Sequence, residues 1–248
     1  MNIFLEFAYL FFIGSVIGWV IELFFRRFIS SANPERKWIN PGFCTGPYLP
    51  LYGVGLCILY SVSSLEQYHF FKNDWCNKIV LLFLMAFLMT VIEFIAGYVP
   101  LRHGNIRLWD YSSEWGNIDG IICPKFSLLW GLLGAVYYFL IHPYIKNSLE
   151  WLSRNLAFSF FIGVFFGIFI IDVANSMQIV SRLKKFALEN NVIIRYEHIK
   201  AQIRNSYEKT AGKYKYRFFR PFAALKPLSE HLKDFRDSFE KIRPRNKK

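Results

Sequence analysis

The chain has 248 residues, of which 54% are hydrophobic and 19% aromatic, and its formal net charge is +12. The charge is uneven, because residues 182–248 contain 19 of the 30 lysines and arginines, whereas residues 1–181 hold equal numbers of basic and acidic side chains. Apolar residues run almost without interruption for about 20 positions at a time, the length of a helix that crosses a bilayer. This pattern excludes an ordinary water-soluble domain, in which apolar and polar residues would alternate.

Five apolar segments predict membrane-spanning helices. In chain order they are Phe4–Phe25, Pro47–Ser64, Lys78–Val99, Ile121–Ile141 and Leu156–Ile179. Polar links rich in proline, asparagine and tryptophan separate them. The sequence therefore predicts an all-α fold: a polytopic membrane helix bundle over residues 1–181, followed by a basic, helical tail over residues 182–248.

An odd number of spans places the two termini on opposite sides of the membrane. Basic residues concentrate on the cytoplasmic side, so we expect the tail to be cytoplasmic and the N-terminus to lie outside. The first and third links, which this topology places inside, hold seven basic residues against four in the outer links. We expect a multi-pass protein of the cell membrane.

The tail carries apolar residues at helical spacing, beginning with Val192, Tyr196, Ile199 and Ile203. Two interpretations stay open: the tail helices pack on each other or on a second copy, or they dock on anionic lipid headgroups, where each basic residue contributes roughly 1 kcal/mol. Nucleic-acid binding is the least favoured, because positive charge beside a last span is expected without it. The four cysteines show no metal-binding spacing, so we expect no metal, disulfide framework or cofactor.

Three acidic residues, Glu22, Glu93 and Asp172, lie within predicted spans. A carboxylate in hydrocarbon costs several kcal/mol unless it is paired, protonated or facing water. Three interpretations of these acids stay open. They are buried hydrogen-bond partners that hold the bundle together, they form a substrate or proton site, or they lie at the membrane edge. All three lie toward the predicted cytoplasmic ends, which favours one polar cavity that opens inward.

Small residues accompany these acids at helical spacing, and small residues let neighbouring helices approach closely. We predict that the glycines of this pattern are helix-packing positions. They are Gly14, Gly18, Gly97 and Gly131, and Gly163 and Gly167 repeat the spacing in the fifth span.

The links carry further candidate binding residues. Prolines and glycines at the entrance of the second span prevent a regular helix there, and irregular backbone at membrane depth is tolerated where it is buried or lines a cavity. We therefore predict a substrate site that combines the acids with these links. Its residues are Tyr48, Tyr52, Trp109, Asp110, Tyr111 and Asn117, together with Glu22 and Glu93.

Several short motifs occur together in a familiar order and spacing. They are Gly18-Trp19 followed by Glu22, GPYLPLYG from residue 46, Glu93-Phe94, WDYS from residue 109, Asn117 with Gly120, and Ser127 with Trp130-Gly131. Over roughly residues 10–145 the chain resembles the bacterial family of type IV ABC-transporter permeases (CmpB-like). The resemblance implies a multi-span, permease-like protein of the cytoplasmic membrane.

Three classes of function follow from these features. The first is a permease component of an ABC-type transporter; because the sequence lacks the phosphate-binding GxxxxGK[ST] loop, it would need a separate ATPase subunit. The alternative is a non-transporting membrane scaffold or regulator. An enzyme is not expected, because the sequence contains neither HExxH nor GxSxG. The expected partners are the lipid bilayer, an ATP-binding subunit, a second copy and anionic headgroups.

Overall fold

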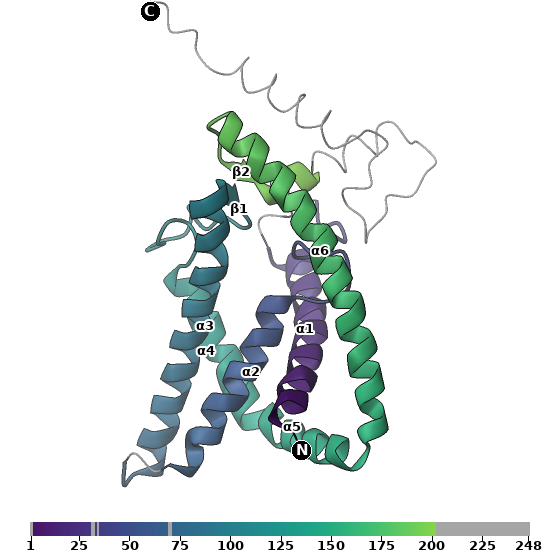
Figure 1. The fold of residues 1–248 in the computed structure, drawn as a ribbon. Helices are drawn as coiled ribbons and strands as arrows, with labels where there is room; N and C mark the ends of the chain where they lie inside the picture. Colours follow the sequence, from purple (N-terminus) through teal and green to yellow (C-terminus); the bar gives the residue numbers. More distant parts are fainter. Residues whose placement is uncertain (1, 31–32, 34, 69–70, 202–248) are drawn as a thin grey trace, which may run out of the picture.

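The computed structural model describes residues 2–201 apart from residues 31–32, 34 and 69–70. This part of the chain is mostly helical, with almost no strand, which confirms the all-α prediction (Figure 1). Its α-helices are α1 (Ile3–Phe28), α2 (Pro50–Ser64), α3 (Asp74–Gly104), α4 (Pro124–Val136), α5 (His142–Arg154) and α6 (Ser159–Glu189). A π-helical turn, Tyr137–Ile141, joins α4 to α5, and short 3-10 turns lie at Leu65–Gln67 and Leu156–Phe158.

Two short strands, β1 (Ile106–Arg107) and β2 (Ile194–Arg195), pair in parallel. They lie at the top of Figure 1, and the N-terminus lies at the bottom. We call these the upper and lower ends of the bundle.

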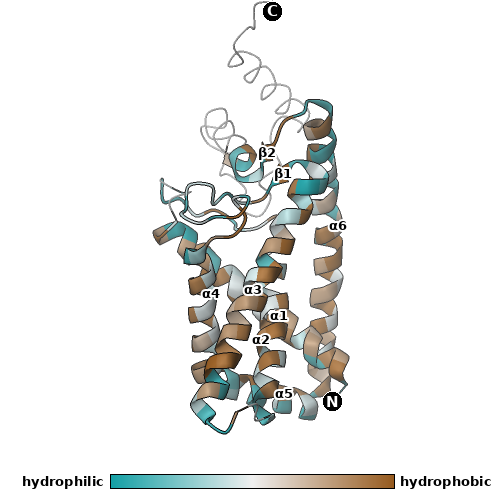
Figure 2. Ribbon diagram, turned by 90° about the vertical axis from the view of Figure 1, so that its left-hand side faces the viewer, coloured by the Kyte–Doolittle hydropathy of each residue, from teal (hydrophilic) through white to brown (hydrophobic). Residues whose placement is uncertain are grey.

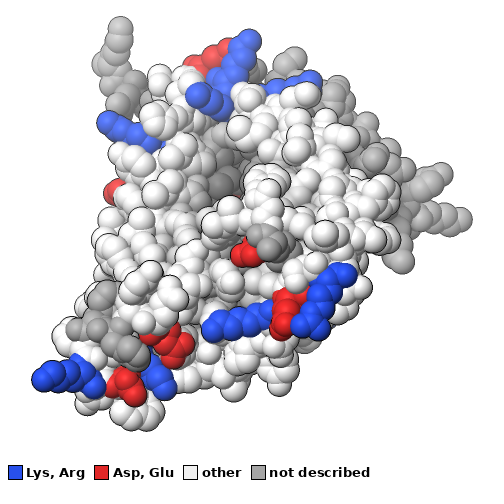
Figure 3. All heavy atoms as spheres, turned by 60° about the horizontal axis from the view of Figure 1, so that its bottom comes forward, with Lys and Arg blue, Asp and Glu red and all other residues white. Residues whose placement is uncertain are grey.

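Four helical stretches of the described chain are long and apolar enough to cross a membrane. They are Ile3–Phe28, Asp74–Gly104, Pro124–Arg154 and Leu156–Glu189. Figure 2 shows the hydrophobic middle of these helices between more hydrophilic ends. In Figure 3, which brings the lower end forward, most charged side chains lie along the top and across the lower half of the view, and the surface between them is largely uncharged. The chain is therefore a multi-pass membrane protein.

The second predicted span, unlike the other four, is not among these long helical stretches. The helix there, α2, has 15 residues and is about 22 Å long, shorter than the ~30 Å hydrocarbon layer. It begins halfway along α1, because the Leu49 amide donates to the Ser15 carbonyl at 2.9 Å. The preceding residues 40–49, which we call the re-entrant segment, are non-helical and largely buried. Pro41, Pro47 and Gly42, which has a φ of 79°, keep this segment out of a helix.

The helices pack as two close pairs, α1 with α2 and α3 with α4, which are joined by contact of α2 with α3. A Cβ atom at Gly14 would lie 2.7 Å from Leu56 Cβ, and one at Gly18 would overlap Tyr52. Gly97 faces Ile121 and Trp109, whereas a Cβ at Gly131 would lie 3.4 Å from that of Ala86 on α3. By contrast, a Cβ built at Gly163 or Gly167 would have no described atom within 4 Å apart from the neighbouring backbone of its own helix.

The predicted boundary between bundle and tail falls inside α6, which continues to Glu189. The residues that follow are part of the upper end, where Leu183, Ala187, Ile194 and Tyr196 form a buried cluster with Ile106. The rest of the predicted tail, residues 202–248, lies outside the described residues, and so does its predicted contact with anionic headgroups.

Gly18→Ala should lower the melting temperature of the detergent-purified protein. The added methyl group overlaps Tyr52, and overpacking of this kind costs about 1–3 kcal/mol. Gly163→Ala is the matched control: it meets no neighbour and improves helix propensity, so the melting temperature should stay the same or rise slightly. Equal melting temperatures for the two variants would contradict the close packing of α1 on α2.

Candidate functional site

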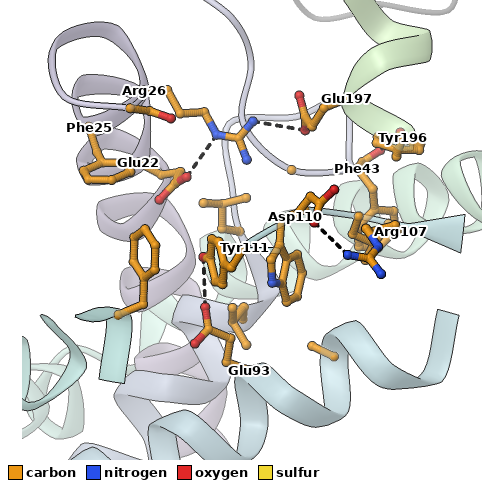
Figure 4. Close-up of a pocket in the computed structure, with 18 of the residues that line it drawn as sticks. Glu22, Phe25, Arg26, Phe43, Glu93, Arg107, Asp110, Tyr111, Tyr196 and Glu197 are labelled. Atoms are coloured by element: carbon orange, nitrogen blue, oxygen red, sulfur yellow. Dashed lines mark hydrogen bonds and ion pairs between the residues drawn. The ribbon is translucent and has the colours of Figure 1, made fainter. Parts of the chain in front are cut away.

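A cavity of about 2130 Å³ lies toward the upper end of the bundle, between α1, α2, α3, α4 and the link at residues 105–123. Figure 4 shows its polar side chains. The predicted binding residues that line it are Glu22, Tyr52, Glu93, Trp109, Asp110 and Tyr111. Tyr48 and Asn117 do not line it; Asn117 instead braces its own link, donating to the Glu114 carbonyl at 2.8 Å.

Glu93 is a buried carboxylate on α3, with 3% of its surface exposed. It accepts hydrogen bonds from Tyr111 Oη at 3.1 Å and from Trp130 Nε1 at 2.9 Å. Gly97, one turn further on, lets the link approach α3, where Trp109 Nε1 donates to the Ile121 carbonyl at 2.8 Å. Among the described residues no cationic side chain forms an ion pair with Glu93, so its partners are neutral donors.

Glu22 lies on the facing wall of the cavity, on α1. It accepts from Arg26 Nε at 2.9 Å and from Tyr52 Oη at 3.1 Å. Spacing of four residues puts Glu22 and Arg26 on one helix face. Arg26 also pairs with Glu197 at 3.0 Å, and Figure 4 shows it between the two carboxylates. Arg26 thus forms ion pairs with both Glu22 and Glu197.

The upper rim of the cavity carries a second charged group, centred on Asp110. Arg107 pairs with it at 2.6 Å and Arg195 at 3.1 Å, because the parallel register of β1 and β2 sets these two arginines side by side. Burial opposes ionisation of Asp110, but hydrogen bonds from Ser112 and Arg107 prevail and hold its pKa below the usual value.

Residues 194–201, which we call the strap, cross the upper end. Lys200 Nζ donates to the carbonyls of Asn40 at 2.9 Å and Gly42 at 3.1 Å. Tyr196 Oη donates to the Phe43 carbonyl at 3.3 Å, and Glu197 holds Arg26. The strap therefore ties the end of α6 to the re-entrant segment and to α1, next to the cavity.

Residues 9–177 match the model of the family described as "Putative ABC-transporter type IV". The chain belongs to this family. The match extends beyond the resemblance noted in the sequence and includes most of α6, whereas the strap lies outside it. No match was found among curated proteins or among solved structures.

Within the family region, Asp172 lies apart from the cavity, so the prediction of one cavity with three acids is wrong for this residue. Asp172 accepts from the amides of Thr45 at 3.2 Å and Gly46 at 2.8 Å. The hydroxyls of Thr45 and Tyr48 also donate to it. The reason is that the re-entrant segment has no helical partners for its donors, and an acid on α6 satisfies them.

Several cavity residues were not among the predicted site residues. The sequence could have identified Arg26, because it follows Glu22 by one helical turn, and Trp130, because it stands in a recognised motif. No sequence pattern indicated Glu197 or Lys200, since their partners Arg26 and Asn40 are distant in the chain. Among the described residues, no group of three His, Cys, Asp or Glu side chains is placed to hold a metal ion.

Asp172→Asn should expose Cys44, whose surface is 2% exposed, to a water-soluble thiol reagent. The N–H groups of the asparagine side chain would face the amides and hydroxyls that donate to Asp172. Loss of one charge-assisted hydrogen bond costs about 1.5–3 kcal/mol. Labelling is read by peptide mass spectrometry. Buried Cys123 should stay unlabelled in the variant, and exposed Cys76 should label in both proteins. Unchanged protection of Cys44 would contradict the role assigned to Asp172.

The strap should loosen as pH falls. Burial opposes the charge of Glu197, but Arg26 and Lys200 prevail and lower its pKa below 4.5. A lowered pKa of this kind increases the free energy of unfolding. The contribution is complete above pH 4.5 and is lost as pH falls through the pKa of the folded state. The melting temperature of the wild type should therefore exceed that of Glu197→Gln at pH 7, and the difference should shrink toward pH 3.

Glu189→Gln is the control for this pH series, because its contact with Lys185 is exposed and long, at 3.9 Å. Its melting temperature should match the wild type at every pH. A difference between wild type and Glu197→Gln that grows on acidification would show that the ion pair with Arg26 does not hold the strap.

Proposed function

We propose that this protein is the membrane-spanning, permease-like component of an ABC-type transporter and that it works with a separate ATPase subunit. The observation that carries the proposal is a large cavity inside a membrane helix bundle, with two carboxylates facing each other across it. Family membership supports the same conclusion. Glu22, Tyr52, Glu93, Trp109 and Tyr111 would bind the solute, and we propose no enzymatic activity for the chain itself.

The shape of the bundle supports access from one side at a time. The cavity lies above a buried apolar cluster that includes Leu10, Leu59 and Met85. None of these three residues lines the cavity, so this cluster separates it from the lower end. We place the upper end in the cytoplasm and the N-terminus outside, because the basic residues after α6 favour the cytoplasmic side.

The ATPase would dock at the upper end. The link at residues 105–123 and the strap meet there, and the strap leads into the basic tail. An ATPase that moves the strap would act on Arg26 and, through it, on Glu22. A second copy of the chain would help to enclose a pathway, since the four long helical stretches and α2 make a small bundle.

A non-transporting scaffold or regulator is the second candidate. The charged groups around the cavity are largely paired within the chain, Arg26 with two acids and Asp110 with two arginines. Paired networks of this kind also occur as purely structural features of protein interiors. In this case the cavity would be a by-product of the short α2, and the strap and tail would hold the interaction partner.

Purification of the tagged protein in mild detergent from its own host should recover a nucleotide-binding subunit in comparable amount, together with ATPase activity. Repeated purification without such a subunit would contradict the transporter proposal. A chain that ends at residue 201 tests the tail, because it retains Leu183, Ala187 and Ile194, which are buried. Capture of the ATPase by this shorter chain would assign docking to the strap and the link.

A further inference from the structure

Building on the proposed transport role, we propose that the cavity takes a cationic amphiphile, a long-chain amine, which enters sideways from the lipid between α1 and α4. The alkyl chain would lie in the groove between these helices and the ammonium group beside Glu93. Four observations support this: the opening of the cavity, its apolar wall, the charge at its polar end, and the aromatic rings beside that charge.

The cavity is open along the side of the bundle. Ile21 of α1, Val54 of α2 and Leu132 of α4 all line it, yet 41%, 39% and 60% of their surfaces are exposed. The helices α1 and α4 are not among the pairs that pack together. Phe25 and Phe126 meet between them, with ring centroids 6.3 Å apart. Since α1 and α4 belong to helical stretches that are apolar enough to cross a membrane, an opening between them would face lipid.

The lining divides into an apolar wall and a polar end. The wall is formed by aliphatic side chains of four helices, which are Ile21, Val54, Ile92, Leu128, Leu129 and Leu132. The polar end holds Glu22, Glu93 and the hydroxyls that bind them. A small polar solute would leave the wall unmatched, and a simple hydrocarbon would leave the polar end unmatched. An amphiphile fits both.

The charge at the polar end favours a cation. Glu93 accepts two hydrogen bonds from neutral donors, and an ionised carboxylate has room for about four. Its neighbour across the cavity, Glu22, shares Arg26 with Glu197, which also pairs with Lys200 at 3.7 Å. Around Arg26, the acids Glu22, Glu93 and Glu197 thus outnumber the cations Arg26 and Lys200 by one. An ammonium group would supply the missing charge, whereas a phosphate or sulfate would face carboxylates.

Aromatic rings complete a surface suited to an ammonium group. Tyr111 stacks on Phe126 with centroids 4.2 Å apart, and Tyr52 lies 5.3 Å from Trp130. Tyr52 donates a hydrogen bond to Glu22, and Tyr111 and Trp130 donate hydrogen bonds to Glu93. Their ring faces attract cations, and aromatic surroundings of this kind are a recurrent means of binding ammonium ligands.

The test is binding of radiolabelled hexadecylamine to the protein purified in an uncharged maltoside detergent. Binding should saturate and should be displaced by unlabelled hexadecylamine. Hexadecanol, hexadecyl phosphate and ethylamine should not displace it at the same concentrations, since they lack the charge, carry the opposite charge or lack the chain. Equal displacement by hexadecanol or by hexadecyl phosphate would overturn the proposal.

Two variants locate the site. Glu93→Gln should weaken binding at least about tenfold, the loss expected when one charge-assisted hydrogen bond is removed. Leu132→Trp should weaken it by filling the groove without changing any charge, and it covers the case in which Glu93→Gln fails to fold. Glu150→Gln, at an exposed ion pair of α5, should bind as the wild type does. Unchanged affinity in folded Leu132→Trp would show that the amine binds elsewhere.

The binding assay needs no ATPase, so the two proposals fail separately. Hexadecylamine binding by a protein that never captures an ATPase would support the ligand and contradict the transporter. Capture of an ATPase by a protein that shows no saturable amine binding would contradict the ligand class and leave the transporter standing.

Discussion

A backbone that leaves its helical path inside a hydrocarbon layer must find other partners for its amide groups, and this constraint shapes the whole molecule. The re-entrant segment meets it through Asp172, which accepts from the amides of Thr45 and Gly46 and from two hydroxyls. The Leu49 amide then bonds to the Ser15 carbonyl, so α2 begins halfway along α1. The space above the start of α2 becomes the cavity.

The position of α2 also determines which groups meet in that space. Close approach at Gly18 brings Tyr52 to α1, where its hydroxyl reaches Glu22. The link after α3 reaches the cavity from the other side and places Tyr111 on Glu93. The strap closes the upper end with Glu197 on Arg26. Two acids on separate helices thus share one cavity, although each is fixed by its own set of partners.

Local patterns predicted much of this arrangement. Long apolar runs identify the four long spans, because hydropathy and length are properties of each segment alone. The motifs around Glu22, Glu93 and Trp109 pointed to one site, and the cavity brings them together. The shortness of α2 was predicted only in part. Prolines and glycines indicated an irregular entrance to the second span, but its start halfway along α1 depends on the contact of Leu49 with Ser15, which the sequence does not show. The partners of Asp172 lie over 120 residues earlier in the chain, and spacing carries no signal at that separation.

Amide hydrogen exchange of the protein in a lipid bilayer tests most directly whether the re-entrant segment is locked inside the bundle. The amides of Thr45 and Gly46 belong to no helix, yet they should exchange as slowly as those of neighbouring α1, because Asp172 binds them away from water. The exposed link around Trp115, 85% of whose surface is open, supplies the fast reference. Exchange of Thr45 and Gly46 at the rate of that link would contradict the account.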